Sequence, residues 1–157
     1  MCWRIKSRKV PEAKVARRDI KVIKLVWREG LLSLYEDFPY KVGNTYCLPE
    51  ELKDDMGKLY HDKFYYITIH KGFHSYSTKV KLTKAKGTDV YYIDGENCNL
   101  PYRKGRKWDF VLLECIIPRG ATYYYNKREG HYVSDTIYIA GTRNVEEIEL
   151  WNPRKKK

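Results

Sequence analysis

The chain has 157 residues, a mass of 18.8 kDa and a formal net charge of +11, with 43% hydrophobic and 32% charged residues. This length suits one domain with a buried core, and the composition excludes a chain that is disordered as a whole. No apolar run approaches the ~18 residues that a membrane-spanning helix needs, and the N-terminus carries no apolar signal segment. We therefore expect a cytoplasmic protein without a membrane partner.

The positive charge lies at the two ends of the chain. Residues 1–28 contain ten Lys or Arg and two acidic residues, whereas residues 29–153 carry 17 basic and 18 acidic residues. We expect a mobile basic arm, a β-rich domain and a basic tail, in this order: 1–16, 17–152 and 153–157. Basic ends attract phosphates without specificity and do not by themselves indicate a nucleic-acid groove.

Hydrophobic runs and alternation predict strands along most of the chain. The predicted strands are 20–27, 31–35, 64–70, 89–93, 110–117, 122–125 and 132–139. The run 110–117 is almost entirely apolar, which predicts a position at the centre of the sheet.

Helix is scarce in the predicted fold. Pro49 and the acids that follow it predict two helical turns over 49–57. Ser77 or Thr78 is a candidate cap for a second helix over 77–86, and 145–151 suits a helix or a strand. The fold class is therefore α+β and predominantly β: a compact antiparallel or mixed sheet, or two packed sheets, with a few short helices.

The four cysteines do not indicate a metal site. Cys2, Cys47, Cys98 and Cys115 form no Cys-x-x-Cys pair, and no His stands at metal-ligand spacing from them. Without an export signal we expect four reduced thiols, no metal and no cofactor.

The densest polar cluster follows the predicted strand at 64–70. Lys71, His74, Ser75 and Tyr76 place cationic, imidazole and hydroxyl groups around a turn at Gly72. Such a strand-to-loop transition can present donors to an anionic ligand. The alternative is that the aromatic side chains pack inward and the polar groups are solvated.

A basic loop precedes the predicted central strand. Arg103, Lys104, Arg106 and Lys107 surround Gly105, which suits a phosphate clamp because Arg supplies forked donors and Gly permits close approach. The alternative is an exposed hairpin loop whose charge keeps it soluble.

Three consecutive tyrosines offer stacking surfaces for a base. Strand alternation puts Tyr124 on one face and both Tyr123 and Tyr125 on the other, so at most two can share a pocket. Tyr124 is the candidate stacking residue. The alternative is an ordinary strand with one face in the core.

No catalytic motif is present in the sequence. It contains no phosphate-binding glycine loop, dinucleotide fingerprint, serine-hydrolase elbow or metalloprotease helix, and no recognised nucleic-acid-binding motif. No carboxylate is placed to orient His70 or His74 as an acid–base catalyst. We therefore expect a binding protein with no catalytic residue rather than an enzyme.

One pattern spans about two-thirds of the chain. It consists of four segments: Phe38–Gly43, Lys71–His74, Glu114–Gly120 and Tyr132–Ile139. This layout resembles small uncharacterised proteins of bacteriophages and gut bacteria. That family has no known activity that could be transferred.

A second resemblance is to the ADP-ribosyltransferase fold. Ser75–Thr78 stands near the place of the Ser-Thr-Ser strand of those enzymes, and Val111–Tyr123 resembles the following strand with its leucines, Pro-x-Gly and aromatic residue. Val133–Ile137 stands where a Glu-x-Glu is expected, and Leu34–Glu36 lacks the usual Arg. The resemblance implies a nucleotide-shaped cleft without the glutamate that activates transfer.

These observations suggest a phage-type protein that sequesters a small anionic nucleotide, an NAD-derived or cyclic immune signal, as an anti-defence sponge in the host cytoplasm. A strand edge rich in Tyr, Ile and Val suggests a homodimer. One alternative is a nucleic-acid or host-protein binding module that uses its basic termini. Another is a divergent ADP-ribosyltransferase-like enzyme.

Overall fold

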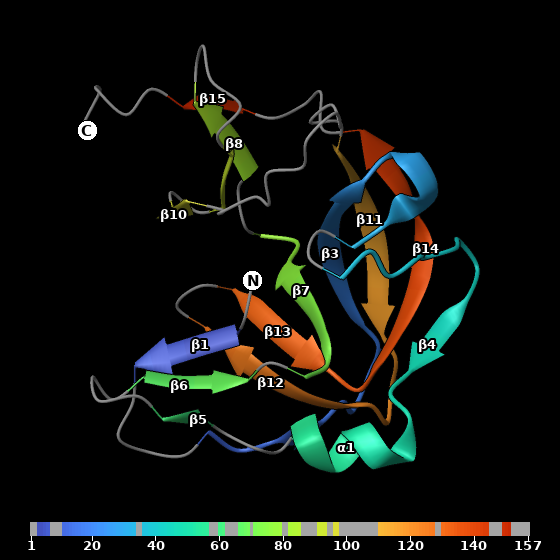
Figure 1. The fold of residues 1–157 in the computed structure, drawn as a ribbon, viewed down its shortest axis with the longest axis vertical. Helices are drawn as coiled ribbons and strands as arrows, with labels where there is room; N and C mark the ends of the chain where they lie inside the picture. The colour runs from blue at the N-terminus through green and yellow to red at the C-terminus, as the bar shows by residue number, and fades with distance from the viewer. Residues whose placement is uncertain are drawn as a thin grey trace.

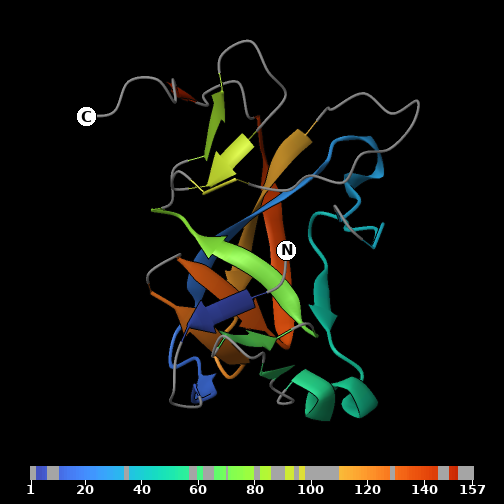
Figure 2. The same ribbon diagram turned by 60° about the vertical axis from the view of Figure 1, so that its left-hand side comes forward.

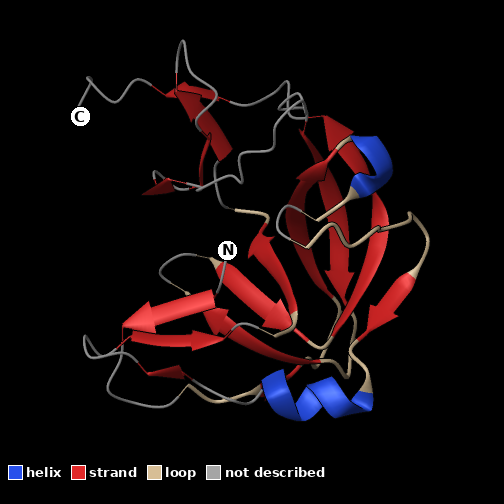
Figure 3. Ribbon diagram, viewed as in Figure 1, coloured by secondary structure: helices blue, strands red, loops and turns tan. Residues whose placement is uncertain are grey.

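The structure, a computed structural model, describes residues 3–6, 11–33, 36–56, 60–61, 66–69, 71–79, 82–85, 91–93, 96–97, 110–127, 130–144 and 149–151. Among these residues, helix is limited to α1 (Glu50–Met56) and the 3-10 turn η1 (Glu29–Leu31), and strand dominates (Figure 3). The predominantly β fold class with few short helices is confirmed.

The strands follow the chain in this order: β1 (Trp3–Lys6), β2 (Lys14–Val15), β3 (Ile20–Trp27), β4 (Thr45–Cys47), β5 (Tyr60–His61), β6 (Tyr66–Ile69), β7 (Phe73–Ser77), β8 (Leu82–Ala85), β9 (Tyr91–Ile93), β10 (Glu96–Asn97), β11 (Phe110–Ile117), β12 (Thr122–Asn126), β13 (His131–Ser134), β14 (Thr136–Asn144) and β15 (Glu149–Trp151).

An antiparallel eight-stranded sheet forms the body of the molecule. Its strand order is β2-β12-β13-β7-β3-β11-β14-β4. Two smaller sheets have the orders β1-β6-β5 and β10-β9-β8-β15, and β15 pairs with β8 in parallel. In Figure 1, β3, β11 and β14 stand upright, while β12 and β13 run away from them at a steep angle with β7 between the two groups.

The large sheet curls back on itself at Asp135. The Asp135 amide donates to the Thr122 carbonyl at 3.0 Å, and the Asp135 Oδ1 accepts from the Thr122 amide at 3.0 Å. The chain therefore leaves β13, which pairs with β7 and β12, and enters β14, which pairs with β11 and β4 (Figure 2). The single strand predicted at 132–139 is thus two strands. Asp135 lies between them and binds the backbone of Thr122 with both its amide and its side chain.

The curled sheet encloses a core built from alternate positions of its strands. Val22 and Val26 of β3 and Leu113 and Ile117 of β11 belong to one core cluster, and all four are at most 1% exposed. The runs predicted at 20–27 and 110–117 are β3 and β11 to the residue. β11 lies between β3 and β14, which confirms its predicted central place.

Several other predicted elements are confirmed. The helix predicted over 49–57 is α1. The predictions at 64–70 and 89–93 contain β6 and β9, and that at 122–125 lies within β12. Of the two alternatives for 145–151, the structure shows a strand, β15.

The strand predicted at 31–35 does not form over residues 31–33, and residues 34 and 35 lie outside the described residues. Gly30 (φ 70°) and Leu31 (φ 48°) have left-handed backbone, which turns the chain instead of extending it. Within the described residues that follow, only the isolated bridges Val26–Ser33 and Leu32–Pro39 remain.

The helix predicted over 77–86 is also wrong. Ser77 ends β7, and its Oγ accepts from the Lys79 amide at 3.2 Å in a local turn instead of capping a helix. Residues 82–85 form β8, which pairs with β9 and β15, so strand pairing overrides the local helix signal.

The N-terminal segment joins the fold. We expected residues 1–16 to be an arm outside the domain, but β1 pairs with β6 and β2 pairs with β12. The alternation Trp3-Arg4-Ile5-Lys6 is a strand pattern that the high charge of this segment obscured.

Candidate functional site

A surface groove of about 1200 Å³ opens beside the corner between β2 and β3. We call it the tyrosine groove; it is lined by Lys14, Val15, Arg17, Arg18, Asp19, Ile20, Lys21, Tyr123, Tyr125 and Tyr132. It combines the two chemical features that the sequence suggested, aromatic rings and cations, but from different residues.

Three tyrosines share one face of the groove. Tyr123 and Tyr125 lie two positions apart on β12, so their side chains point the same way, and Tyr132 of β13 is the register partner of Tyr125. The rings of Tyr125 and Tyr132 stack with centroids 4.2 Å apart and planes 20° apart. The Tyr123 ring lies 5.8 Å from that of Tyr132. The three partly exposed rings therefore form a nearly continuous aromatic surface.

Four cations line the groove beside these rings. Lys14, Arg17, Arg18 and Lys21 are all exposed, and Asp19 is the one acidic residue among the lining residues. The Asp19 Oδ1 accepts from the Arg119 amide at 2.9 Å, so this carboxylate has a structural role. The lining has a net charge of +3, which favours an anionic ligand.

Backbone pairing holds the cationic segment against the aromatic one. Lys14 is the register partner of Tyr123, the Ala16 amide donates to the Ala121 carbonyl at 2.8 Å, and the Gly120 amide donates to the Ala16 carbonyl at 2.8 Å. Ala16 is buried, with 2% of its surface exposed, so its apolar side chain helps to hold the turn between β2 and β3 against the sheet. Residues about a hundred positions apart in the chain thus meet at a fixed register.

The Tyr132 hydroxyl does not add negative charge at neutral pH. Burial, with smaller contributions from Tyr125 and Tyr123, raises the pKa of Tyr132 to about 12. This hydroxyl therefore remains protonated and able to donate a hydrogen bond.

Two of the residues predicted from the 70–79 cluster come together around a third residue that was not predicted. His74 Nδ1 lies 3.2 Å from His131 Nε2, and the Tyr76 ring stacks on the His131 ring with centroids 4.7 Å apart. His131 is only 2% exposed, and burial, followed by the nearby His74, lowers its pKa well below the usual 6.5. It is a neutral imidazole packed inside the protein, with little surface to offer a ligand.

The other predicted residues do not join this group. Lys71 is exposed at the turn before β7. Ser75 is fully buried on the opposite face of β7 from His74 and Tyr76, and its Oγ has no hydrogen-bond partner within the described part of the chain. The cluster therefore divides between two faces of one strand. Arg103, Lys104, Arg106 and Lys107 lie outside the described residues.

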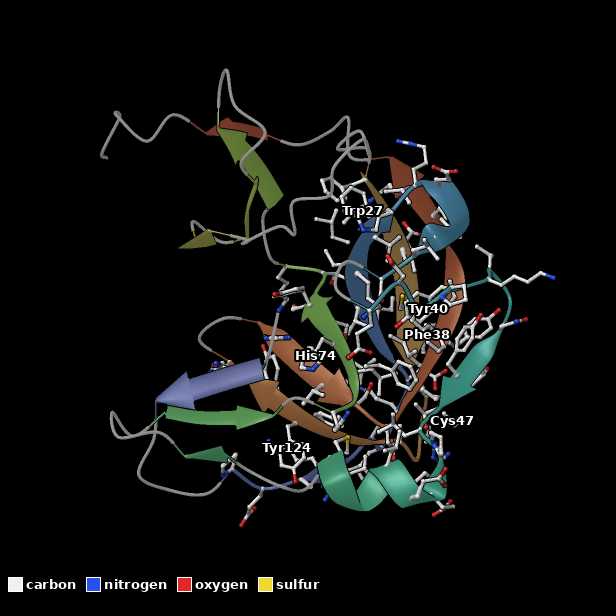
Figure 4. The ribbon with its side chains drawn as sticks, in the orientation of Figure 1. Trp27, Phe38, Tyr40, Cys47, His74 and Tyr124 are labelled. Carbon is white, nitrogen blue, oxygen red and sulfur yellow. The ribbon has the colours of Figure 1, made fainter. Side chains whose placement is uncertain are left out.

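Tyr124, the predicted stacking residue, has its side chain in the core and not among the residues that line the groove. It is 7% exposed and packs with Met56 and Val133 beside α1 (Figure 4). The expected alternation holds, but Tyr123 and Tyr125 are the pair that reaches the groove. Strand alternation could divide the triplet but could not indicate which face was open.

The lysines and arginines of the groove were not predicted as binding residues. Their signal was the excess of cations in residues 1–28, of which we assigned residues 1–16 to a mobile arm and read the charge as nonspecific. Lys14, Arg17, Arg18 and Lys21 belong to that excess, and β2 and β3 place them beside Tyr123 and Tyr125.

The described residues contain neither a metal-binding cluster nor a membrane-spanning helix. Among the described residues, no group of three or more His, Cys, Asp or Glu is placed to hold a metal ion. The same residues include no helix that is long and apolar enough to span a bilayer. Cys47 is exposed and Cys115 is buried, and neither is in a disulfide.

No protein-family model, curated protein or solved structure matches this chain. The resemblances to small phage proteins and to ADP-ribosyltransferases therefore stay predictions.

Proposed function

We propose that this protein binds a nucleotide-type ligand in the tyrosine groove and holds it without transforming it. The base stacks on the ring surface of Tyr123, Tyr125 and Tyr132, and the phosphates contact the cations beside it. The observation that carries the proposal is that rings and cations line one groove at a register set by the Lys14–Tyr123 pair.

The chemistry of each group suits its role. Base–aromatic stacking contributes about 1–3 kcal/mol per base. The guanidinium groups of Arg17 and Arg18 offer forked donors to phosphate oxygens, and Lys14 and Lys21 add mobile point charges. The groove offers charge and stacking, and the proposal assigns no acid–base role to its residues.

The proposal keeps the class of ligand inferred from the sequence and changes its location. The 70–79 cluster divides between two faces, so it offers no single surface for a phosphate, whereas the groove does. That the ligand is an NAD-derived or cyclic immune signal of small size stays a prediction of the sequence analysis. So does the proposed homodimer.

Calorimetric titration of the full chain with ATP, ADP-ribose, a cyclic dinucleotide and an oligothymidylate tests the proposal. We expect at least one of these ligands to bind, and Tyr125→Leu and the double variant Arg17→Gln/Arg18→Gln each to weaken it at least ~5-fold, in line with the loss of one stacking or phosphate contact.

Matched controls are available elsewhere on the large sheet and its loops. Tyr138→Leu changes a partly exposed tyrosine of β14, and Lys41→Gln removes an exposed cation, both outside the groove lining. Binding that falls equally in groove and control variants, or no binding by any ligand of the panel, would refute the proposal.

A further inference from the structure

We infer that the ligand of the tyrosine groove is a single-stranded nucleic acid, held along its backbone with little regard to sequence. This inference rests on the proposed function and specifies its ligand. The inferred ligand is a polymer, whereas the sequence suggested a small nucleotide.

The size and exposure of the groove favour a polymer. Its volume of about 1200 Å³ exceeds the range of about 300–1000 Å³ that is usual for small-molecule sites. Its four cations are all exposed. Tight retention of a small anion needs donors that enclose it and exclude water, whereas a chain that makes several contacts can bind on an open surface.

The arrangement of the rings suits more than one base. Tyr123 and Tyr125 are two positions apart on an extended strand, which spaces their side chains by roughly 7 Å. A mononucleotide has one base and can use one such platform, whereas a single strand can stack one base beside each. Bases in a duplex are already stacked on one another, so they cannot meet these ring faces.

The residues that line the groove also favour binding that does not depend on the base sequence of the nucleic acid. None of its ten residues is Asn, Gln, Ser or Thr, the uncharged side chains that commonly read base edges. Ring faces accept every base, and the cations contact the phosphates that all nucleotides share.

Charge predicts how the complex responds to salt. For single strands, the logarithm of the affinity falls by about 0.7 per neutralised phosphate for each decade of salt. Contacts from Lys14, Arg17, Arg18 and Lys21 therefore predict a slope of about −2 to −3. Removing one of these cations reduces the slope by about 0.7.

Fluorescence anisotropy with labelled oligothymidylates of about 2, 4, 8 and 16 nucleotides tests the inference, with a duplex of about 16 base pairs and unlabelled ATP as comparisons. We expect affinity to rise at least ~10-fold from the shortest strand to a plateau reached by about 8 nucleotides. The duplex binds at least ~10-fold more weakly than the longest strand. Oligouridylates and oligoadenylates of equal length bind within about 5-fold of oligothymidylate.

Variants tie the effect to the groove. Arg18→Gln reduces the salt slope, Tyr125→Leu weakens long strands more than ATP, and the control Lys41→Gln changes neither quantity. The variants replace exposed or partly exposed side chains, so we expect them to fold, and circular dichroism of each variant checks this.

The possible failures are distinguishable. If ATP or the dinucleotide binds as tightly as the longest strand and depends on the groove, the polymer inference fails and the proposed function survives. If the duplex binds as well as the single strand, stacking has no role and the inference fails. If no probe binds, or if groove and control variants behave alike, both are refuted.

Discussion

Lys24 carries a charged amine at a position of β3 that faces the apolar core. It lies on β3 between Val22 and Val26, whose side chains are in the core, and its Nζ donates to the His74 carbonyl. The same Nζ lies 5.4 Å from the centroid of the Tyr40 ring. Burial lowers the pKa of Lys24 to about 8, although Cys115 and Glu36 oppose the shift. A charge at this place therefore lowers the stability of the fold.

We expect Lys24→Met to raise the free energy of unfolding at pH 7 by about 1–3 kcal/mol, because it replaces a desolvated cation with an apolar side chain of similar length. The gain should depend on pH. The folded-state pKa of Lys24 is depressed below the unfolded value, so between about pH 8 and pH 10.5 the unfolded chain binds the proton and the folded one does not. Wild-type stability rises through this group over that range, and the advantage of Met shrinks.

Urea unfolding at pH 7 and near pH 9.5 measures the effect. Lys21→Met is the control, since Lys21 is exposed on the same strand and its replacement should change stability by less than ~0.5 kcal/mol. A loss of stability in Lys24→Met, or a gain that is the same at both pH values, would contradict this account.

At the scale of elements, the turn before β7 determines how the two parts of the large sheet join. β7 pairs with β13 on one side and β3 on the other, so it links the steeply inclined strands to the upright ones (Figure 1). Gly72 begins this link with φ +125°, and a Cβ there would lie 2.5 Å from Val133 Cγ2 and 3.1 Å from the Ser134 carbonyl oxygen. Glycine is therefore required both for its backbone conformation and for the close approach of β13.

We expect Gly72→Ala to destabilise the protein by about 3–5 kcal/mol, the sum of backbone strain and overpacking. Gly43→Ala separates the two causes, because Gly43 also has positive φ (+91°) but nothing lies within 4 Å of its Cβ position. That variant should lose only about 1–2 kcal/mol. Thermal unfolding of both measures the difference, and equal losses would show that packing against Val133 contributes nothing.

At the scale of the whole molecule, the N-terminal residues connect separate sheets. β1 pairs with β6 in a three-stranded sheet and β2 pairs with β12 in the large sheet, while Ala16 exchanges backbone hydrogen bonds with the 120–121 turn. The segment that carries much of the net charge is thus also part of the folded structure. Its charge and its structural role must be tested separately.

Deletion of residues 1–16 should lower the melting temperature by roughly 5–10 °C, since it removes about 2–3 kcal/mol of strand pairing and burial from a chain of this size. It should also weaken ligand binding, because it removes Lys14 and frees the corner that holds Arg17 and Arg18. Lys14→Gln in the full chain is the control, and it should keep the wild-type melting temperature while binding more weakly. A truncated protein that melts like the full chain would show that these strands are dispensable.

An element could be predicted from the sequence where nearby residues alone determine its structure. β3 and β11 were predicted to the residue because apolar residues dominate both runs and most of their side chains are buried. Residues 31–33 were mistaken for part of a strand because the left-handed turn at Gly30 and Leu31 leaves no mark in hydrophobic alternation. Ser77 was mistaken for a helix cap because the same hydroxyl chemistry stabilises a local turn.

The predominance of strands, the central place of β11 and the division of Tyr123–Tyr125 between two faces follow from patterns over a few residues, so they could be predicted. Which tyrosine face is open, and which cations lie beside it, became known from the folded chain. The Lys14–Tyr123 register and the Asp19–Arg119 hydrogen bond join segments about a hundred residues apart. Such pairings depend on the curl of the whole sheet, and no local pattern encodes them.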